Sequence, residues 1–154
     1  MINGPNVTPG YEGNPKANED NFFMADGKRW FRTGDQGAFD DEGYLRLTGR
    51  LKEIINRGGE KISPLEVDAV LLGHPEIAQI VCFGVSHPKL GEDIAAAVVL
   101  TEGSQLNEKD IREFAAEHIA NFKVPRSIMI LEEIPKGPTG KIQRIGMAEK
   151  LSLI

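Results

Sequence analysis

Residues 53–66 read EIINRGGEKISPLE, and in this stretch a hairpin signal runs directly into a helix signal. The pair Gly58-Gly59 supplies the positive φ angles of a tight turn, so a β-hairpin is predicted around it. Ser63 is then placed as an N-cap, with Pro64 at the first helical position and Glu66 three residues after the cap. That spacing predicts a capping box and a helix that ends before the glycine and proline of the following turn.

Beyond this helix the sequence predicts two strands, a helix, a third strand and a last helix, in that order. A helix is predicted from Asn107, with Asp110 at its N3 position and an apolar stripe that extends to Phe122. Apolar runs predict two buried strands before it, at 77–85 and 94–100. A short third strand is predicted at 127–131 and a last helix at 145–151. From residue 53 onward the fold class is therefore α+β, with a mixed or antiparallel sheet, flanking helices and one core.

The sequence before residue 53 has a different character. Residues 1–32 are rich in Gly, Pro and Asn and show almost no periodicity, so they are predicted to build no core of their own and to lie on the surface of a larger body. A second hairpin is predicted over residues 37–47, with its turn at Asp40-Asp41-Glu42-Gly43. This part is expected to be β-rich and to lack a core of its own.

Composition and charge exclude several classes of function. The 154 residues are 40% apolar and carry 18 basic and 23 acidic side chains, a net charge of −5. That balance argues against nucleic acid or an anionic membrane as the main partner. No apolar run approaches the ~20 residues of a membrane span, and no secretory leader is recognisable. Cys82 is the single cysteine and lies in an apolar run, so we expect a buried structural thiol and a reducing, cytoplasmic location.

The loop that ends at Lys141 contains GPTGK, which invites comparison with a phosphate-binding loop. Such a loop needs a glycine where this chain has Pro135 and a Ser or Thr where it has Ile142, so that interpretation fails. What remains is a flexible loop that presents one lysine. Local sequence alone favours an ordinary solvated surface lysine as the interpretation of Lys141.

Other polar residues give weak signals when taken singly. Asp35 follows a Thr-Gly turn, and its carboxylate could accept hydrogen bonds from a sugar diol or simply stabilise the turn. Arg50 belongs to a charged segment that would also suit a plain linker. The histidines have no metal-ligand spacing, so no metal site is predicted.

Taken together and in order, these segments resemble the successive core motifs of the adenylate-forming superfamily. The motifs are FRTGD at 31–35, GRLK at 49–52, GGEKISPLE at 58–66, PK at 135–136 and GK at 140–141. The superfamily includes acyl-CoA synthetases, luciferases and peptide-synthetase adenylation domains. The GPNV at residues 4–7 is similar to the acyl-CoA synthetase branch, and residues 30–68 look most like oxalyl-CoA synthetases.

The resemblance implies a domain plan and a reaction. Residues 1–49 would be the tail of a large N-terminal AMP-binding domain, 50–52 a hinge, and 53–154 the C-terminal lid domain. A carboxylic acid and MgATP would give acyl-AMP, and CoA would then displace AMP to give a thioester. ATP, Mg²⁺ and CoA are the implied cofactors, with the Mg²⁺ ligands and the acyl pocket outside this chain. The chain is therefore expected to be incompetent without that N-terminal domain as its partner, and the identity of the acid cannot be read from it.

The resemblance also assigns roles to single residues. Lys141 would contact carboxylate and phosphate oxygens during adenylation, where a cation stabilises the developing charge. Asp35 and Arg50 would bind the nucleotide, and Lys52 would be the hinge about which the lid swings. The remaining candidates would line the passage for pantetheine and CoA; they are Gly58, Gly59, Glu60, Phe122 and Arg126. Gly137 departs from a common threonine, so the loop before Lys141 is expected to be looser.

Two alternatives stay open at this point. A non-catalytic binding domain could have kept the fold, and an adenylation domain could load a carrier protein instead of CoA. Retention of Lys141, Asp35 and Arg50 together favours an enzyme. The opening GPNV disfavours carrier-protein loading.

Overall fold

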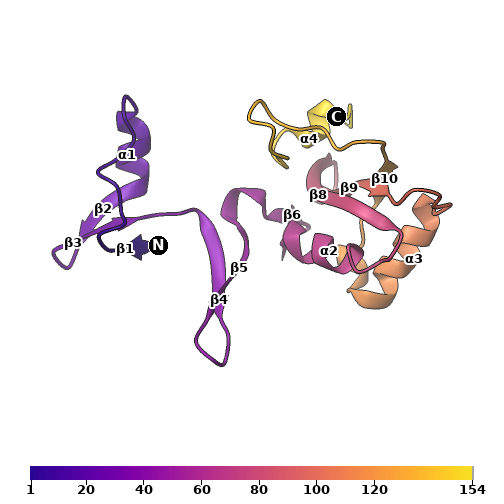
Figure 1. Cartoon of the computed structure of the whole chain (residues 1–154), viewed down its shortest axis with the longest axis horizontal. Helices are drawn as coiled ribbons and strands as arrows, with labels where there is room; N and C mark the ends of the chain where they lie inside the picture. Colours follow the sequence, from indigo (N-terminus) through magenta and orange to yellow (C-terminus); the bar gives the residue numbers. More distant parts are fainter. Residues whose placement is uncertain (154) are drawn as a thin grey trace. The chain divides into compact units, whose positions relative to one another are not determined.

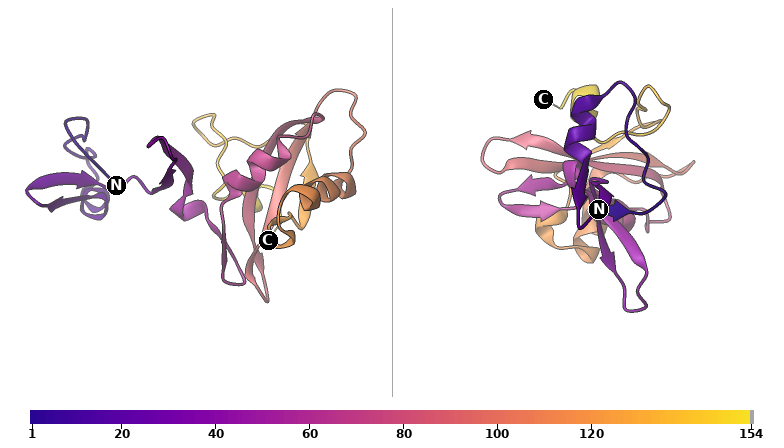
Figure 2. Two further views of the ribbon diagram at one scale, coloured as in Figure 1. Left: turned by 90° about the horizontal axis from the view of Figure 1, so that it is seen from below. Right: turned by 90° about the vertical axis from the view of Figure 1, so that its left-hand side faces the viewer.

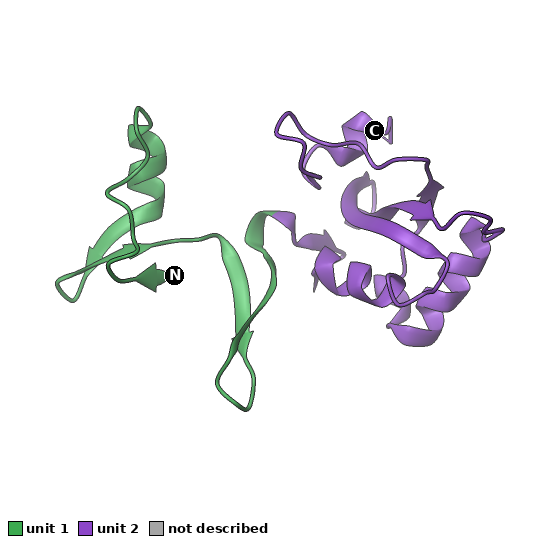
Figure 3. Ribbon diagram, viewed as in Figure 1, with its two compact units in different colours: residues 1–52 green, residues 53–154 purple. Residues whose placement is uncertain are grey.

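The computed structural model describes residues 1–153 and divides the chain into two compact units, residues 1–52 and 53–154 (Figure 3). Each unit has its own strands and is described by itself.

The second unit is built on a mixed five-stranded sheet (Figure 1). Its longest strands are β8, Ile77–His87, and β9, Gly91–Leu100, which pair antiparallel from Ile77↔Leu100 to His87↔Gly91. The short β10, Ser127–Ile130, lies parallel to β9 on its other side. The hairpin of β6, Ile55–Arg57, and β7, Glu60–Ile62, joins the sheet through the pair Arg57↔Gly91. The predicted α+β class with a mixed sheet is thus confirmed.

Helices cover both faces of this sheet. Alternate residues of β8 and β9 point to opposite faces, which is why both strands are apolar almost throughout. On one face, Cys82 and Ala96 pack with α2, Pro64–Leu71, and α3, Glu108–His118. Figure 2 shows these two helices against the sheet. On the other face, Val81, Phe83, Ala95 and Ala97 pack with α4, Met147–Lys150.

Three details of the predicted helices are wrong. Ser63 precedes α2 but makes no side-chain cap bond, and the Glu66 carboxylate instead binds the Lys123 ammonium, so the capping box does not form. The stripe of α3 ends before Phe122, which lies in the separate 3₁₀ turn η2, Asn121–Lys123. The predicted start of α3 is confirmed, since Asn107 and Asp110 form a reciprocal capping box. The last helix is a single turn, shorter than predicted.

The first unit is more regular than its sequence predicts. Its N-terminal part holds the helix α1, Pro15–Asn21, and a three-stranded antiparallel sheet in the order β1-β3-β2. These strands are β1, Ile2–Asn3; β2, Phe22–Ala25; and β3, Lys28–Phe31. The predicted β-rich character of this part agrees with these strands, whereas the helix α1 was not predicted.

The local chemistry explains this difference. Asn14 caps α1 by accepting a hydrogen bond from the amide of Ala17, and Pro15 stands at the first turn. Asp26 and Gly27 both have positive φ angles, 52° and 69°, as in the tightest hairpin turns.

The predicted second hairpin is confirmed. It consists of β4, Asp35–Phe39, and β5, Leu45–Arg50, and is followed by the 3₁₀ turn η1, Leu51–Glu53. No apolar side chain of residues 1–52 is fully buried. Within residues 1–153, no helix is long and apolar enough to cross a membrane.

Candidate functional site

Lys141 lies at the end of a small hairpin. Lys136 and Ile142 form an antiparallel bridge at its base, and the amide of Gly137 donates to the carbonyl of Lys141 over 2.8 Å. Gly140, with φ of 75°, makes the turn. The Lys141 side chain is exposed, and its amine has no hydrogen-bond or ion-pair partner within residues 1–153. The hairpin therefore presents a free ammonium group.

Neighbouring charges of this hairpin are paired. Lys136 binds Glu133 across three residues of chain, and this contact holds the pKa of the Glu133 carboxyl below its usual value. Both side chains are exposed, so the pair contributes little to stability. Its effect is to leave Lys141 as the unpaired cation of the loop.

A buried charge cluster lies directly after the hairpin. The Arg144 guanidinium donates to the Asp68 carboxylate and, over 3.2 Å, to Glu53. Asp68 also accepts the backbone N–H of Cys82 over 2.7 Å. Burial raises the pKa of the Asp68 carboxyl, and Arg144 opposes that rise.

The structure confirms the prediction that the Cys82 thiol is buried. The residue is fully buried in the core, and burial raises the pKa of its thiol well above the usual value, with the nearby Asp68 charge adding to the rise. A thiol held neutral in this way is a poor nucleophile.

Asp35 and Arg50 face each other across the first unit's hairpin. They are register partners in β4 and β5, and Arg50 Nε lies 3.1 Å from Asp35 Oδ1. The Thr33 hydroxyl accepts the Asp35 amide at 3.1 Å and Gly34 turns the chain, so the carboxylate is held at the start of the strand. Arg50 is largely exposed and can turn toward a ligand without leaving its strand.

The Gly58-Gly59 turn lies against the turn that joins β8 and β9. The two glycines have φ angles of 60° and 100°, and the Gly58 amide donates to the Leu90 carbonyl over 2.8 Å. Glu60 is exposed on the outgoing strand. The hairpin therefore offers backbone and one carboxylate to solvent.

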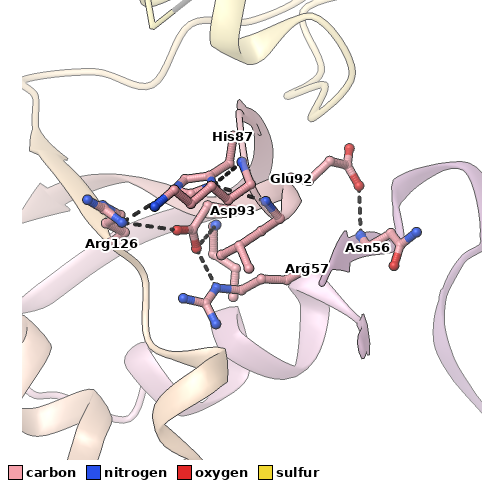
Figure 4. A network of polar contacts seen from close by, with 9 residues as sticks. Asn56, Arg57, His87, Glu92, Asp93 and Arg126 are labelled. Atoms are coloured by element: carbon pink, nitrogen blue, oxygen red, sulfur yellow. Dashed lines mark hydrogen bonds and ion pairs between the residues drawn. The ribbon is translucent and has the colours of Figure 1, made fainter. Parts of the chain in front are cut away.

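Beside this hairpin, a buried carboxylate lies between two arginines (Figure 4). Asp93 is 1% exposed, and its Oδ1 accepts from Arg57 Nε at 2.7 Å and from the Ile94 amide at 2.9 Å. Asp93 Oδ2 lies 3.9 Å from Arg126 Nη1 and has no hydrogen-bond partner within residues 1–153. The structure thus brings Arg126 near Arg57, the residue that directly precedes the Gly58-Gly59 turn.

His87 adds to the same cluster. Its Nε2 lies 3.4 Å from Arg126 Nη1, while its Nδ1 accepts from the amides of Lys89 and Leu90. The ring therefore caps the β8–β9 turn. Figure 4 shows it beside Arg126, in the same network as Asp93.

The structure does not gather all predicted site residues. Asp35, Arg50 and Lys52 belong to residues 1–52, and the other candidates to residues 53–154. Within residues 1–153, no hydrogen bond or ion pair joins Lys141 or Phe122 to the Asp93 cluster. Phe122 is 37% exposed, and the Lys123 Nζ atom lies 5.8 Å from the centroid of the Phe122 ring.

The part of the chain that the structure describes holds no cluster of His, Cys, Asp and Glu fit for a metal ion. His74 and His118 both contact the Phe114 ring.

Sequence reasoning missed the charged residues Asp68, Asp93 and Arg144. A signal was present for two of them, since Asp68 stands on the apolar side of a helix and Asp93 at the start of an apolar strand. A charge at such a position needs a partner. The partners come from distant segments, and sequence spacing does not identify them.

Comparison with known proteins gives a consistent result. Residues 66–141 match the family model described as AMP-binding enzyme C-terminal domain. The chain is 55% identical over 148 residues to a probable CoA ligase of Humulus lupulus. It is 54% and 50% identical to the oxalate–CoA ligases of Arabidopsis thaliana and Saccharomyces cerevisiae. These matches cover 93–96% of the chain but only 27% of each relative.

Solved structures agree with this result. The chain matches ATP-bound MatB of Rhodopseudomonas palustris with a TM-score of 0.83 and 28% identity, over 96% of this chain and 29% of that one. It also matches the o-succinylbenzoate CoA synthetase of Bacillus subtilis in complex with its acyl-adenylate intermediate. That match has a TM-score of 0.81 and 33% identity, over 93% of this chain and 28% of the other.

Proposed function

Residues 66–141 belong to the family of AMP-binding enzyme C-terminal domains, and from this premise we propose that the chain is the C-terminal part of an ATP-dependent acyl-CoA synthetase. The chain spans about a quarter of the length of its curated relatives, so the reaction needs a larger partner domain. In the first half-reaction a carboxylate oxygen attacks the α-phosphorus of ATP, and pyrophosphate leaves. In the second, the CoA thiolate attacks the acyl carbonyl, and AMP leaves with its phosphate oxygen.

The observation that carries the proposal is the exposed, unpaired Lys141 on a short hairpin attached to a packed domain. Charge on the phosphate oxygens is redistributed as pyrophosphate departs, and one fixed cation there lowers the barrier. An amine on a protruding hairpin can enter a site on another domain without disturbing the core from which it projects. We assign Lys141 to this role in adenylation.

The other candidates take supporting roles in the same scheme. Asp35 would accept hydrogen bonds from the ribose hydroxyls, with Arg50 turned from its ion pair toward the nucleotide. Lys52 lies in η1, next to the boundary between the two units, and would be the hinge. The exposed backbone of Gly58 and Gly59, with Glu60, would border the pantetheine passage, while Phe122 and Arg126 would contact the CoA nucleotide.

A finer proposal concerns the acid. Two relatives at 54% and 50% identity are named oxalate–CoA ligases, so we propose oxalate as the first acid to test. We also propose a cytoplasmic location, in keeping with a single buried cysteine. Fractionation of the source cells would test it.

A chimera tests the proposed function directly. This chain would replace the corresponding quarter of the Saccharomyces cerevisiae oxalate–CoA ligase, to which it is 50% identical. We expect oxalate-dependent ATP–pyrophosphate exchange and formation of oxalyl-CoA, and none of either from the isolated 154-residue chain. A chimera that elutes as a folded monomer or oligomer but forms no acyl-AMP with oxalate or a panel of other acids would refute the proposal.

A further inference from the structure

Arg144, which follows the 136–142 hairpin, has two carboxylate partners. Its guanidinium contacts Asp68 through Nη2 and Glu53 through Nη1, and its side chain is only 19% exposed. The two carboxylates are likewise 8% and 16% exposed. Charges this sheltered from water interact strongly and keep a defined geometry.

Asp68 ties Arg144 to the packed core. Its second oxygen accepts the backbone N–H of Cys82 at 2.7 Å, so one carboxylate joins helix α2, strand β8 and the arginine. Its neighbours Val67 and Leu71 are fully buried. The Asp68 carboxylate is therefore a rigid point of attachment.

Glu53 ties Arg144 to the boundary of the two units. It is the first residue of the second unit and directly follows Lys52, the proposed hinge. Arg144 in turn lies three residues after Lys141. Only Ile142 and Gln143 lie between them, and Ile142 forms the bridge at the base of the hairpin. One side chain thus connects the residue after the proposed hinge with the base of the hairpin that carries Lys141.

We propose that Arg144 is a positioning residue for Lys141. By binding Asp68 and Glu53 together, it fixes the C-terminal base of the 136–142 hairpin to the core and to the residue after the proposed hinge. A rotation at Lys52 then carries Glu53, Arg144 and Lys141 as one body. Arg144 touches no substrate itself, and the inference rests on the proposed function for its consequence in catalysis.

The choice of variant must separate anchoring from folding. Arg144→Ala leaves two sheltered carboxylates without a cation, and such a loss can prevent folding. The double variant Arg144→Met with Asp68→Asn removes both charges of the Arg144–Asp68 pair and keeps similar volumes. It leaves one carboxylate, that of Glu53, without its cation, instead of two. Glu53→Gln weakens only the link to the boundary. Glu133→Gln is the matched control, because it breaks an exposed ion pair on the same hairpin.

The first measurement needs no enzymatic activity. In the 154-residue chain, amide hydrogen exchange of Gly137, whose N–H binds the Lys141 carbonyl, reports on closure of the hairpin. We expect exchange there to rise about tenfold or more in the double variant, as the base detaches, with the amides of β9 unchanged and those of β8 unchanged apart from Cys82, which donates to residue 68. Glu133→Gln should leave it within about twofold. Unchanged Gly137 exchange in the double variant would overturn the anchoring role.

The second measurement uses the chimera with the oxalate–CoA ligase. We expect the double variant to lower kcat for adenylation about 10–100-fold with little change in KM for ATP, since misplacement affects the transition state more than ground-state binding. Thioester formation from acyl-AMP and CoA should stay within about threefold. A loosened hairpin with normal adenylation would overturn the positioning role. If the unaltered chimera forms no acyl-AMP, the proposed function fails, and the exchange result alone decides whether Arg144 anchors the hairpin.

Discussion

Lys141 is an exposed cation on a hairpin whose other charges are paired, so its removal changes chemistry and little else. In the chimera, Lys141→Ala should slow adenylation about 10²–10³-fold, the usual loss for one preorganised charge contact. Stability should change by less than ~0.5 kcal/mol, as for most exposed loop substitutions. Pyrophosphate exchange measures the first effect and urea unfolding the second. Lys109→Ala, an exposed lysine on α3, is the control. An equal loss in thioester formation from acyl-AMP would show that Lys141 is not confined to the first step.

Asp93 makes a different prediction, because it is buried and charged. It neutralises Arg57 at 2.7 Å and lies near Arg126, so Asp93→Ala leaves a partly sheltered guanidinium without its carboxylate. We expect a loss of about 3–5 kcal/mol in the free energy of unfolding, as for other broken buried pairs. Asp41→Ala, in an exposed turn, should cost under ~0.5 kcal/mol. Chemical denaturation of both variants measures the difference, and a similar small loss in each would mean that the pair contributes little.

At this scale the sequence drew attention to exposed charged residues more readily than to buried ones. Lys141 stands out because glycines and a proline precede it, and those residues are visible in the sequence. Arg144 and Asp68 are 76 residues apart, and only the folding of the chain brings them together. A sequence pattern shows that Asp68 needs a partner, but not which residue supplies it. The roles proposed for Asp35, Arg50 and the CoA-passage residues remain predictions.

Helix α3 offers a test at the scale of one element. Its capping box joins Asn107 and Asp110 through bonds in both directions, and the helix buries Ile111 and Ala115. Asn107→Ala should lower the free energy of unfolding by about 1 kcal/mol, because the first amides of the helix lose their acceptor. Thermal unfolding followed by circular dichroism measures this. Gln105→Ala, in the loop before the cap, is the control. A loss no larger than that of the control would show that water replaces the cap at no cost.

Elements were predictable where local chemistry and burial agree. The strands 77–87 and 91–100 are apolar because both of their faces are covered, and their sequence reflects that. The individual strands and the helix of the first 32 residues were not predicted because their apolar residues are few and only partly buried, although Asp26-Gly27 is a strong hairpin signal. The capping box at Ser63 failed for another reason. Lys123, far along the chain, offers Glu66 a full positive charge in place of a backbone amide.

For the molecule as a whole, the proposed hinge can be tested by stiffening it. Lys52 lies in a 3₁₀ turn at the boundary of the two units, and proline would fix its φ angle. In the chimera, Lys52→Pro should slow thioester formation at least tenfold more than adenylation, because only the second half-reaction needs the lid to swing. Lys52→Ala removes the charge but keeps the rotation, so it serves as the control. Equal losses in both half-reactions would count against a hinge.

The distribution of burial makes a last prediction about which part of the chain is independently stable. Every fully buried apolar side chain belongs to residues 53–153, from Ile55 onward, whereas residues 1–52 bury none. A domain of about 100 residues with one core typically has ~5–15 kcal/mol of stability, while short strands without a core have almost none. The fragment 53–154 should therefore unfold cooperatively, with a Tm within about 5 °C of the whole chain, and the fragment 1–52 should show no cooperative transition. Calorimetry of the three proteins measures this. A sharp transition in 1–52 would show that the first unit has stability of its own. A Tm of 53–154 lowered by more than about 8 °C, which corresponds to over ~1 kcal/mol, would show that the first unit stabilises the second.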